Sequence, residues 1–491
     1  MLKRSFSILC FISIPLFFSF TAPFDDELLS VFAKINADVQ ANGQAYETLG
    51  QASESIGHRL TGSKNGQKAE DFAFNLFKKY GYQDLKFMPF EVESWMRDTV
   101  TLSVVPNKSD NFREIKVVSL AHSPVEARIK GQIVDVGNGL EPDFAAMRDA
   151  IKGKIVLVNI GLQAPIKGNR NLHRSEKTAL AIQYGASGVI MVNGVPGNIL
   201  LTGTASVTGS LIPIPSVCIS LESGKMIREW IKTENLFAMI DMHNFSKMIK
   251  ARNVVATIKG QKKYAKEKII IGGHLDSWDL ATGAMDNGIG SFSVMDIARV
   301  FKVLNLKPKR TIEFVMFMGE EQGLLGSRAM IRELIKSGDI NKVAYMMNLD
   351  MANNAKGFNI SGRDEMKAFF ETLGENIKKI DPSYANEIHN QAGLHSDHQG
   401  FMINGVPTAS PTGSIAPEAI GCYHADCDRF NLIKKQDLNN TVRYSAMLLY
   451  ALANAEDLPA KRLDDNQTKE FLIKQNLKKE LIIGKDWRWE E

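Results

Sequence analysis

The segment IIIGGHLDSWDLATGAMDNGIGS, residues 269–291, carries the features that decide the fold. It begins with three isoleucines, which predict a buried strand, and the two glycines that follow predict the end of that strand. His274 and Asp276 come next, at the place where α/β sheets carry their functional side chains. Asp286 lies in a second glycine-flanked turn, and residues 289–304 after it have the pattern of a helix.

Two interpretations of this segment are open at this point. An imidazole and a carboxylate on adjoining loops can begin a transition-metal site. Alternatively, His274 orders a turn and Asp286 caps the helix that follows, because aspartate is a favoured N-cap residue. The segment alone does not separate the two, because short motifs also arise by chance.

Length and composition are those of an ordinary globular protein. At 491 residues the chain is too long for one hydrophobic core, and we expect two domains with extensions. Hydrophobic residues make up 44% and charged residues 23% of the chain, which is typical of globular proteins. The net charge of +4 is small, and no basic run is long enough to predict nucleic-acid binding.

The N-terminus has the pattern of a secretory signal. Lys3 and Arg4 precede an apolar run over residues 8–20, and small residues follow it. This run is short for a membrane span, and no other stretch approaches about 18 apolar residues without charges. We therefore expect residues 1–23 to be a signal peptide and the mature protein to be exported, secreted or periplasmic, without a membrane span.

The cysteines support the same compartment. Cys422 and Cys427 bracket His424, so they either form a local disulfide, as an oxidising compartment allows, or bind zinc together with the histidine. A second cysteine pair or histidine at zinc-finger spacing is missing, which favours the disulfide. Cys218 lies in an apolar run and is predicted to be a core residue.

Strand and helix patterns divide the mature chain. Residues 106–250 predict a compact unit of their own, without a catalytic constellation, which either shapes access to a site or packs passively. Residues 251–460 return to alternating strands and helices, and residues 461–491 form a C-terminal extension. The main predicted helices are residues 27–55, 65–80, 177–184, 222–232, 289–304 and 435–453, and the main predicted strands are residues 87–105, 130–136, 153–158, 188–192, 214–219, 253–258, 269–271, 311–318 and 342–349.

Further carboxylates stand at the ends of the later predicted strands. Glu320 and Glu321 follow one strand, and Asp350 follows the next. Two adjacent carboxylates repel each other unless a cation lies beside them. With a metal present, one glutamate binds it and the other stays free as a general base. The alternatives are a helix start for the glutamates and a turn for Asp350.

Together with His424, these residues make a set of two imidazoles and several carboxylates. If one carboxylate is shared, the set forms two metal shells and leaves one glutamate unbound. Two close metals that hold a water between them are a hydrolytic arrangement. Oxygen ligands with one imidazole per metal suit zinc, with cobalt or manganese as alternatives. The set is His274, Asp286, Glu320, Glu321, Asp350 and His424.

Several motifs carry a family resemblance. The runs GGHLDSWDLATGAMDNG, GEEQG and NLD, and the YH-x-x-x-D of residues 423–428, resemble the dizinc exopeptidases of the zinc aminopeptidase and glutamate carboxypeptidase superfamily. The early run IGHRLTGS is also similar, and the resemblance covers nearly all of the mature chain. It implies an α/β fold with a mixed-sheet, phosphorylase/hydrolase-like catalytic domain, built from residues 24–105 and 251–460, and a protease-associated domain inserted at residues 106–250.

The resemblance also implies a role for each site residue and two Zn²⁺ per chain. Glu320 would be the general base, Asp276 would hold the ring of His274, and Asp428 would be the partner of His424. The implied metal ligands are His274 and Asp350 for one ion, Glu321 and His424 for the other, and Asp286 for both.

The implied activity is that of a secreted peptidase that acts on the end of small peptides or dipeptides, by a metal-bound hydroxide with a glutamate base. The alternatives are a plain aminopeptidase on longer peptides, a single-zinc acyltransferase-like relative, and a non-catalytic binding module, and a homodimer is left open. Asp397 could hold a free ammonium and Arg429 a terminal carboxylate, whereas His395 and His398 are interpreted as pocket or surface residues.

Overall fold

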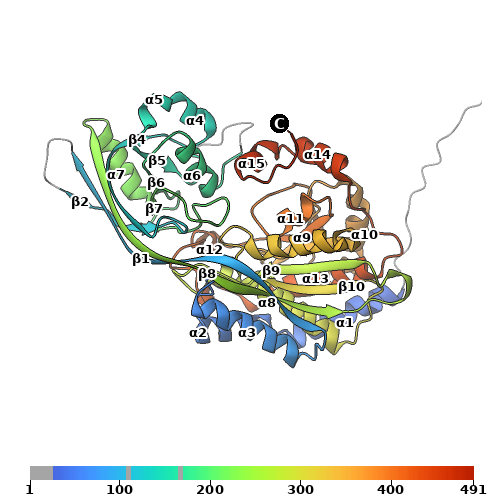
Figure 1. The fold of residues 1–491 in the computed structure, drawn as a ribbon. Helices are drawn as coiled ribbons and strands as arrows, with labels where there is room; N and C mark the ends of the chain where they lie inside the picture. The colour runs from blue at the N-terminus through green and yellow to red at the C-terminus, as the bar shows by residue number, and fades with distance from the viewer. Residues whose placement is uncertain (1–25, 107–111, 164–169, 491) are drawn as a thin grey trace, which may run out of the picture.

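The computed structural model describes residues 26–106, 112–163 and 170–490, so the predicted signal peptide lies outside the described residues. These residues form a larger and a smaller lobe, which a long two-stranded ribbon joins (Figure 1). The ribbon consists of β1 (Leu85–Pro106) and β8 (Leu236–Ile258), which pair antiparallel from one lobe into the other. Strands 87–105 and 253–258 were predicted; the rest of β8 was not, because its middle is polar and half-exposed.

The larger lobe is built on a mixed sheet, as predicted. Strand β9, with its three isoleucines, lies parallel between β10 and β11, and β10 pairs antiparallel with β8. Because β9, β10 and β11 run in the same direction, their carboxyl ends meet at one edge of the sheet. The strands from the outer edge inward are β13 (Glu387–His389), β12 (Ala355–Asn359), β14 (Thr408–Gly413), β11 (Val343–Asn348), β9 (Lys268–His274) and β10 (Thr311–Phe317).

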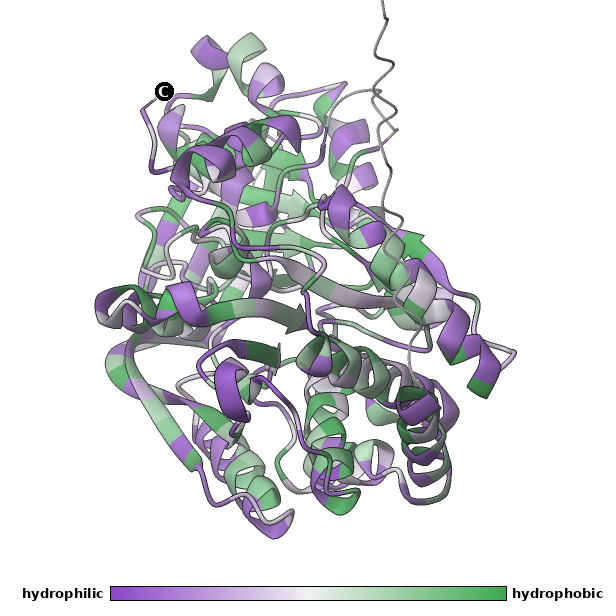
Figure 2. Ribbon diagram, turned by 90° about the vertical axis from the view of Figure 1, so that its right-hand side faces the viewer, coloured by the Kyte–Doolittle hydropathy of each residue, from purple (hydrophilic) through white to green (hydrophobic). Residues whose placement is uncertain are grey.

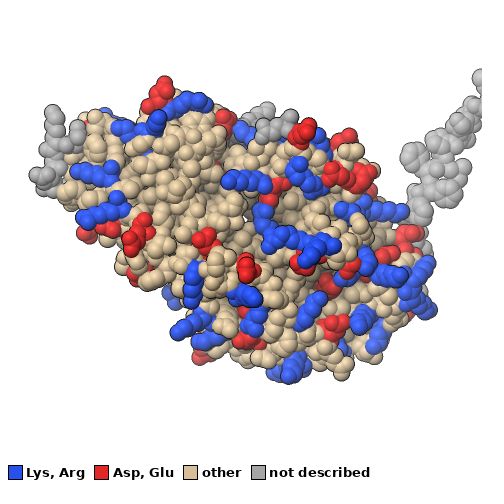
Figure 3. All heavy atoms as spheres, viewed as in Figure 1, with Lys and Arg blue, Asp and Glu red and all other residues tan. Residues whose placement is uncertain are grey.

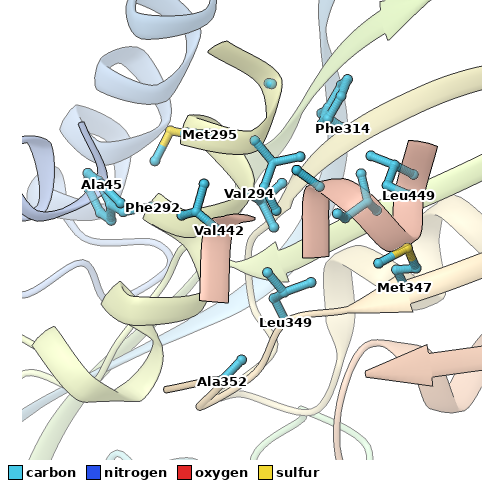
Figure 4. Packing of buried hydrophobic residues seen from close by; sticks show 14 of the residues in the cluster. Ala45, Phe292, Val294, Met295, Phe314, Met347, Leu349, Ala352, Val442 and Leu449 are labelled. Carbon is cyan, nitrogen blue, oxygen red and sulfur yellow. The ribbon is translucent and has the colours of Figure 1, made fainter. Parts of the chain in front are cut away.

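Helices cover both faces of this sheet, which is why β9 is apolar on both sides. Ile269 and Ile271 point into the larger core, while Ile270 points into the core on the opposite face. Figure 4 shows Val294 and Val442, from two helices, in one cluster with the strand residues Phe314 and Met347. The helices of the larger core are α1 (Asp26–Asn42), α2 (Ala45–Ser55), α3 (Lys64–Lys79), α8 (Ile289–Val303), α10 (Lys367–Ile380) and α13 (Lys435–Asn454), and those of the opposite face are α9 (Leu325–Ser337) and α11 (His398–Met402).

The smaller lobe has its own two hydrophobic cores around a continuation of the same sheet. In β5, Val156 and Val158 face one core and Ile155 and Leu157 face the other. Its strands are β2 (Arg113–Glu114), β3 (Val117–Ser119), β4 (Glu126–Asp135), β5 (Ile155–Asn159), β6 (Gly188–Val192) and β7 (Ser216–Ile219), and its helices are α4 (Glu141–Ala146), α5 (Arg148–Ile151), α6 (Arg174–Gln183) and α7 (Leu221–Ile231).

The C-terminal extension contacts both lobes. Its helices α14 (Asp465–Lys474) and α15 (Lys478–Ile483) pack through Leu472 and Leu481 against Ala392 and Met402 of the larger lobe. Helix α15 also lies against α6 of the smaller lobe (Figure 1). The extension therefore closes the space between the lobes on one side.

The surface agrees with the composition. Green, hydrophobic residues predominate along the interior strands, and purple, hydrophilic residues line the outer helices (Figure 2). On the face shown in Figure 3, basic and acidic side chains are interspersed and no large patch of one sign stands out. None of the helices in the described ranges is both long and apolar enough to cross a membrane.

The last turns of α8 offer a matched test of this packing. Phe301 is 1% exposed and contacts Phe314 and Tyr450, whereas Val303 is 63% exposed. Phe301→Ala is expected to lower the free energy of unfolding in urea by about 3–5 kcal/mol, because it removes a buried ring and leaves a cavity. Val303→Ala should change it by less than about 0.5 kcal/mol. Equal losses would contradict the assignment of this helix face to the core.

Candidate metal centre

The predicted site residues meet at the carboxyl edge of the larger sheet. His274 is the last residue of β9, Glu320 and Glu321 follow β10, and Asp350 follows β11. Asp286 lies in the tight turn Ala284–Gly288 that leads into α8, and the helix begins after Gly288, so Asp286 is not its N-cap. His424 comes from the loop after α12 (Pro417–Ile420), far away in sequence.

The side chains form two half-sites that share Asp286. Its Oδ1 lies 3.3 Å from Nε2 of His274, which is also 3.4 Å from Oδ1 of Asp350. Its Oδ2 lies 2.9 Å from Nε2 of His424, which is also 3.0 Å from Oε2 of Glu321. Each half-site thus offers one imidazole nitrogen and two carboxylate oxygens close enough to surround one metal ion.

Glu320 stands beside both half-sites without belonging to either. Its Oε2 is 3.9 Å from Nε2 of His274. Burial raises the pKa of Glu320 well above its ordinary value, and the neighbouring carboxylates Asp350 and Glu321 raise it further. This leaves one carboxylate near the two half-sites that is free for proton transfer.

The residues fit a pair of metal ions. Oε1 of Glu321 is buried without a hydrogen-bond donor, and burial raises the pKa of this carboxyl group. Burial disfavours a charged His274, but Glu320 and Asp350 outweigh it and raise the pKa of the imidazole well above its ordinary value. The protein alone thus leaves a surplus of negative charge that divalent cations would balance. The atoms available to bind them are nitrogen and oxygen, which zinc accepts as ligands.

Comparison with known proteins assigns the two lobes. Residues 253–449 match the model of peptidase family M28, and residues 128–227 match that of the PA domain. The chain carries an M28 peptidase domain. The PA domain is inserted between its two parts, which confirms the predicted fold class of a catalytic domain with an inserted unit.

Relatives include proteins named for activity at either end of a peptide. Carboxypeptidase Q of Bos taurus is 25% identical over 85% of this chain and 87% of its own length. Leucine aminopeptidase 2 of Trichophyton rubrum is 27% identical over 71% of this chain and 67% of its own length. Among solved structures, the aminopeptidase from Aneurinibacillus sp. strain AM-1 has a TM-score of 0.66 at 25% identity and covers 88% of this chain and 98% of its own. A peptidase M28 precursor from Shewanella amazonensis SB2B has a TM-score of 0.74 at 22% identity, with 89% and 99% covered.

Asp428 of the M28 domain orients the shared carboxylate and not the ring of His424. Its Oδ1 accepts the N–H of Met285 at 2.7 Å and its Oδ2 accepts that of Asp286 at 3.0 Å. Nδ1 of His424 lies instead 3.2 Å from the carbonyl oxygen of Thr202, in the PA domain. The predicted pairing was wrong because the intervening loop folds back and directs Asp428 towards the turn of Asp286.

Asp276 links three parts of the centre. Nδ1 of His274 is 3.1 Å from its carbonyl oxygen and 3.6 Å from its carboxylate. The carboxylate accepts the hydroxyl of Thr61 at 3.0 Å and the N–H of Glu320 at 3.3 Å. Asp276 therefore contacts the ring mainly through its backbone, and its side chain holds the peptide of Glu320.

The turn that contains IGHRLTGS supports the centre through hydrogen bonds. The sequence did not predict this role. Arg59 is fully buried and donates to the carbonyl oxygens of Leu275 and Gly283, at 2.5 and 2.8 Å. Burial lowers the pKa of this guanidinium to about 10, and it remains charged at neutral pH. Thr61 also accepts the N–H of Gly319 at 2.7 Å. One turn thus connects the loops after β9 and β10.

Polar side chains support Asp350 in the same way. Ser396 donates to its Oδ2 at 2.6 Å and accepts from Asn348. Asn287 accepts the N–H of Met351 at 3.0 Å, which ties the turn of Asp286 to the loop of Asp350. Asn287 lies within the recognised run GGHLDSWDLATGAMDNG, which was the available signal, whereas Ser396 is 46 residues away from Asp350 in the sequence.

Asp397 and Arg429 were the candidates for binding the ends of a substrate, and neither lines the cavity at the centre. Asp397 is 0% exposed and lies behind the centre, where burial raises its pKa to about 7. Arg429 is exposed and donates to the carbonyl oxygen of Asp426, outside the cavity at the centre. His395 lines this cavity, and His398 is held by the carbonyl oxygen of Gly393 at 3.1 Å.

The loop of His424 is closed by a disulfide. Cys422 and Cys427 are bonded to each other, which confirms the favoured prediction and excludes both sulfurs as zinc ligands. Tyr423 stacks on the ring of His424 with ring centroids 3.9 Å apart. Cys218 is buried in the core of the PA domain, as predicted.

The centre opens into a cavity between the two domains. The M28 domain contributes the metal-site residues together with Arg328 and Gln399, and the extension contributes Glu480 and Asp486. The remaining wall comes from the PA domain, which is therefore part of the site and not a passive module. Its lining residues are His173, Arg174, Ser175, Glu176, Thr204, Ser206 and Val207.

Asp428 provides a test of the turn that carries the shared carboxylate. Asp428→Asn keeps the size of the side chain but loses one of two acceptors for the N–H groups of Met285 and Asp286. Zinc affinity is expected to fall about 10–100-fold, as it does when groups that orient metal ligands are lost. Competition with a chelator measures this, and Asp426→Asn, an exposed change in the same loop, is the control. Equal affinity in both variants would show that Asp428 does not orient the site.

Proposed function

We propose that this chain is a dizinc exopeptidase that hydrolyses the peptide bond at the end of small peptides, above all unblocked dipeptides. The observation that carries the proposal is the position of Asp286, with one oxygen towards His274 and the other towards His424. A carboxylate between two imidazoles, with further carboxylates on either side, suits two metal ions better than one.

In this proposal His274 and Asp350 hold one zinc ion, Glu321 and His424 hold the other, and Asp286 holds both. When bound, the zinc ions supply Lewis acidity, which polarises the scissile carbonyl and makes a water molecule more acidic. The role of each ligand would thus be to hold an ion at the centre.

Glu320 is the proposed general base. It takes a proton from the attacking water, whose oxygen bonds to the carbonyl carbon, and gives a proton to the amine nitrogen as the C–N bond breaks. Asp276 assists it, because its carboxylate holds the N–H of Glu320 and its carbonyl holds the ring of His274. Asp276 is therefore a positioning residue in this proposal.

The lining of the cavity supports a small substrate. The PA domain and the C-terminal extension each contribute residues to its wall beside the centre. Export is also part of the proposal, and the signal-like pattern of residues 1–23 and the disulfide of Cys422 and Cys427 support it. The second candidate is a plain aminopeptidase, which the leucine aminopeptidase relatives favour.

Glu320→Gln tests the division of roles between the two glutamates. It keeps the shape of the side chain but removes the base, so turnover of a dipeptide should fall about 10²–10⁴-fold while about two zinc ions per chain remain. Glu321→Gln should lose zinc from one half-site. Metal analysis and steady-state kinetics measure both, and loss of zinc from Glu320→Gln with retention by Glu321→Gln would reverse the assignment.

A panel of capped dipeptides tests the choice of substrate. A dipeptide with both ends free should be hydrolysed, and acetylation of its amine or amidation of its carboxylate should each lower kcat/KM by at least about tenfold, because a buried site loses one charged contact. Efficient release of the first residue from long peptides with an amidated C-terminus would show the protein to be a plain aminopeptidase.

A further inference from the structure

The C-terminal extension lies outside the residues that match the family models, yet it lines the catalytic cavity. The match to peptidase family M28 ends at residue 449, and the extension follows it from residue 461. Its residues in the cavity wall are Glu480, Leu481, Gly484 and Asp486. The extension therefore adds to the site a wall that belongs neither to the matched part of the M28 domain nor to the PA domain.

Asp486 ties this wall to the M28 domain. Arg328 of α9 donates from both terminal nitrogens to the carboxylate of Asp486, at 2.5 and 2.6 Å, and Gln399 donates to it at 2.7 Å. Nε of Arg328 donates at 3.0 Å to the carbonyl oxygen of Gly323, in the turn that carries the two glutamates of the centre. A two-fold hydrogen bond between a guanidinium and a carboxylate is strong and directional, so it fixes the extension beside the catalytic turn.

The other side of α15 is held by the PA domain. Ile483 packs against the core of the PA domain, and Oε1 of Glu480 lies 2.9 Å from Nε of Arg170. The backbone also comes close, because a Cβ at Gly484 would lie 4.0 Å from Oε1 of Glu176. The end of the extension therefore spans from one domain to the other across the cavity wall.

The wall stands close to the catalytic turn. One guanidinium group, that of Arg328, separates the carboxylate of Asp486 from the carbonyl oxygen of Gly323. A guanidinium with a hydrogen bond at each end spans about 8 Å. An extended residue spans about 3.3–3.6 Å, so this distance corresponds to roughly two residues of a peptide. A longer peptide that runs towards α15 would meet the extension.

We propose that the C-terminal extension sets the length of the peptide that this protein hydrolyses, because α15 and Asp486 block the cavity beyond about the second residue of the substrate. The inference rests on the proposed function and deepens it, since it names the segment that selects short peptides.

A shortened chain tests this proposal. A chain that stops after Gln475 keeps α14 and removes α15 and Asp486. The substrates are dialanine and pentaalanine, which differ in length alone. With the zinc-loaded full chain, kcat/KM should be at least about tenfold lower for the pentapeptide than for the dipeptide. With the shortened chain the two values should lie within about threefold of each other, because the steric exclusion is gone.

A second variant keeps the whole chain. Glu480→Ala combined with Asp486→Ala removes the ion pairs with Arg170 and Arg328. The ratio of pentapeptide to dipeptide kcat/KM should rise at least about threefold. Asp465→Ala is the matched control, because Asp465 also pairs with an arginine of the extension but is exposed outside the cavity, and it should leave the ratio unchanged.

Circular dichroism checks that each variant is folded, and a shortened chain that does not fold leaves the decision to the double variant. A structural role alone would lower kcat/KM equally for both peptides, so an unchanged ratio in the folded variants would overturn the proposal.

Failure of the proposed function gives a different result. In the Glu320→Gln background, calorimetry compares the binding of both peptides to the full and the shortened or double-variant chains. Weaker binding of the pentapeptide to the full chain, relieved in the variant, supports the inference even if the unmodified protein hydrolyses neither peptide. Hydrolysis with the same ratio in all forms leaves the proposed function standing and refutes the role of the extension, and absence of peptide binding overturns both.

Discussion

The burial of several carboxylates within a few ångströms of one another is the constraint on which the rest of this structure depends. Glu320, Glu321, Asp286 and Asp350 converge at one edge of a sheet whose strands are otherwise apolar. Such a group is stable only if donors and cations surround it. The supporting contacts meet part of this need: backbone N–H groups, hydroxyls, two imidazoles and the buried guanidinium of Arg59 all lie around the centre, and divalent cations would balance the remaining charge.

Much of this arrangement could be predicted from the chain. The strands that lead to His274, Glu320 and Asp350 are short apolar runs, and parallel strands bring their carboxyl ends together. The role of Asp286 came from the family motif and not from its pattern, because an aspartate before a helix is equally well interpreted as a cap.

What could not be predicted depends on contacts between segments far apart. Asp428 is near His424 in sequence, yet its carboxylate faces the N–H groups of the turn at Asp286. The partners of His424, Thr202 and Arg174, belong to the inserted domain, more than two hundred residues away along the chain. Periodicity and short motifs do not predict how an inserted domain, joined to the larger lobe through two strands, is oriented relative to the site. These contacts were therefore known only from the structure.

The ribbon of β1 and β8 has a consequence for how this chain tolerates changes in length. Val92 packs in the core of the larger lobe, and Leu102 and Val104, further along the same strand, pack in that of the smaller. Deleting one residue between them would turn the inward side chains of one lobe outwards. The register shift between Arg97 and Thr99 lies between these two stretches, where Arg97 also binds Asp279 of the larger lobe and Thr202 of the smaller one. A change of length within this ribbon would therefore disturb one of the two cores, whereas a change in a surface loop would leave both in place.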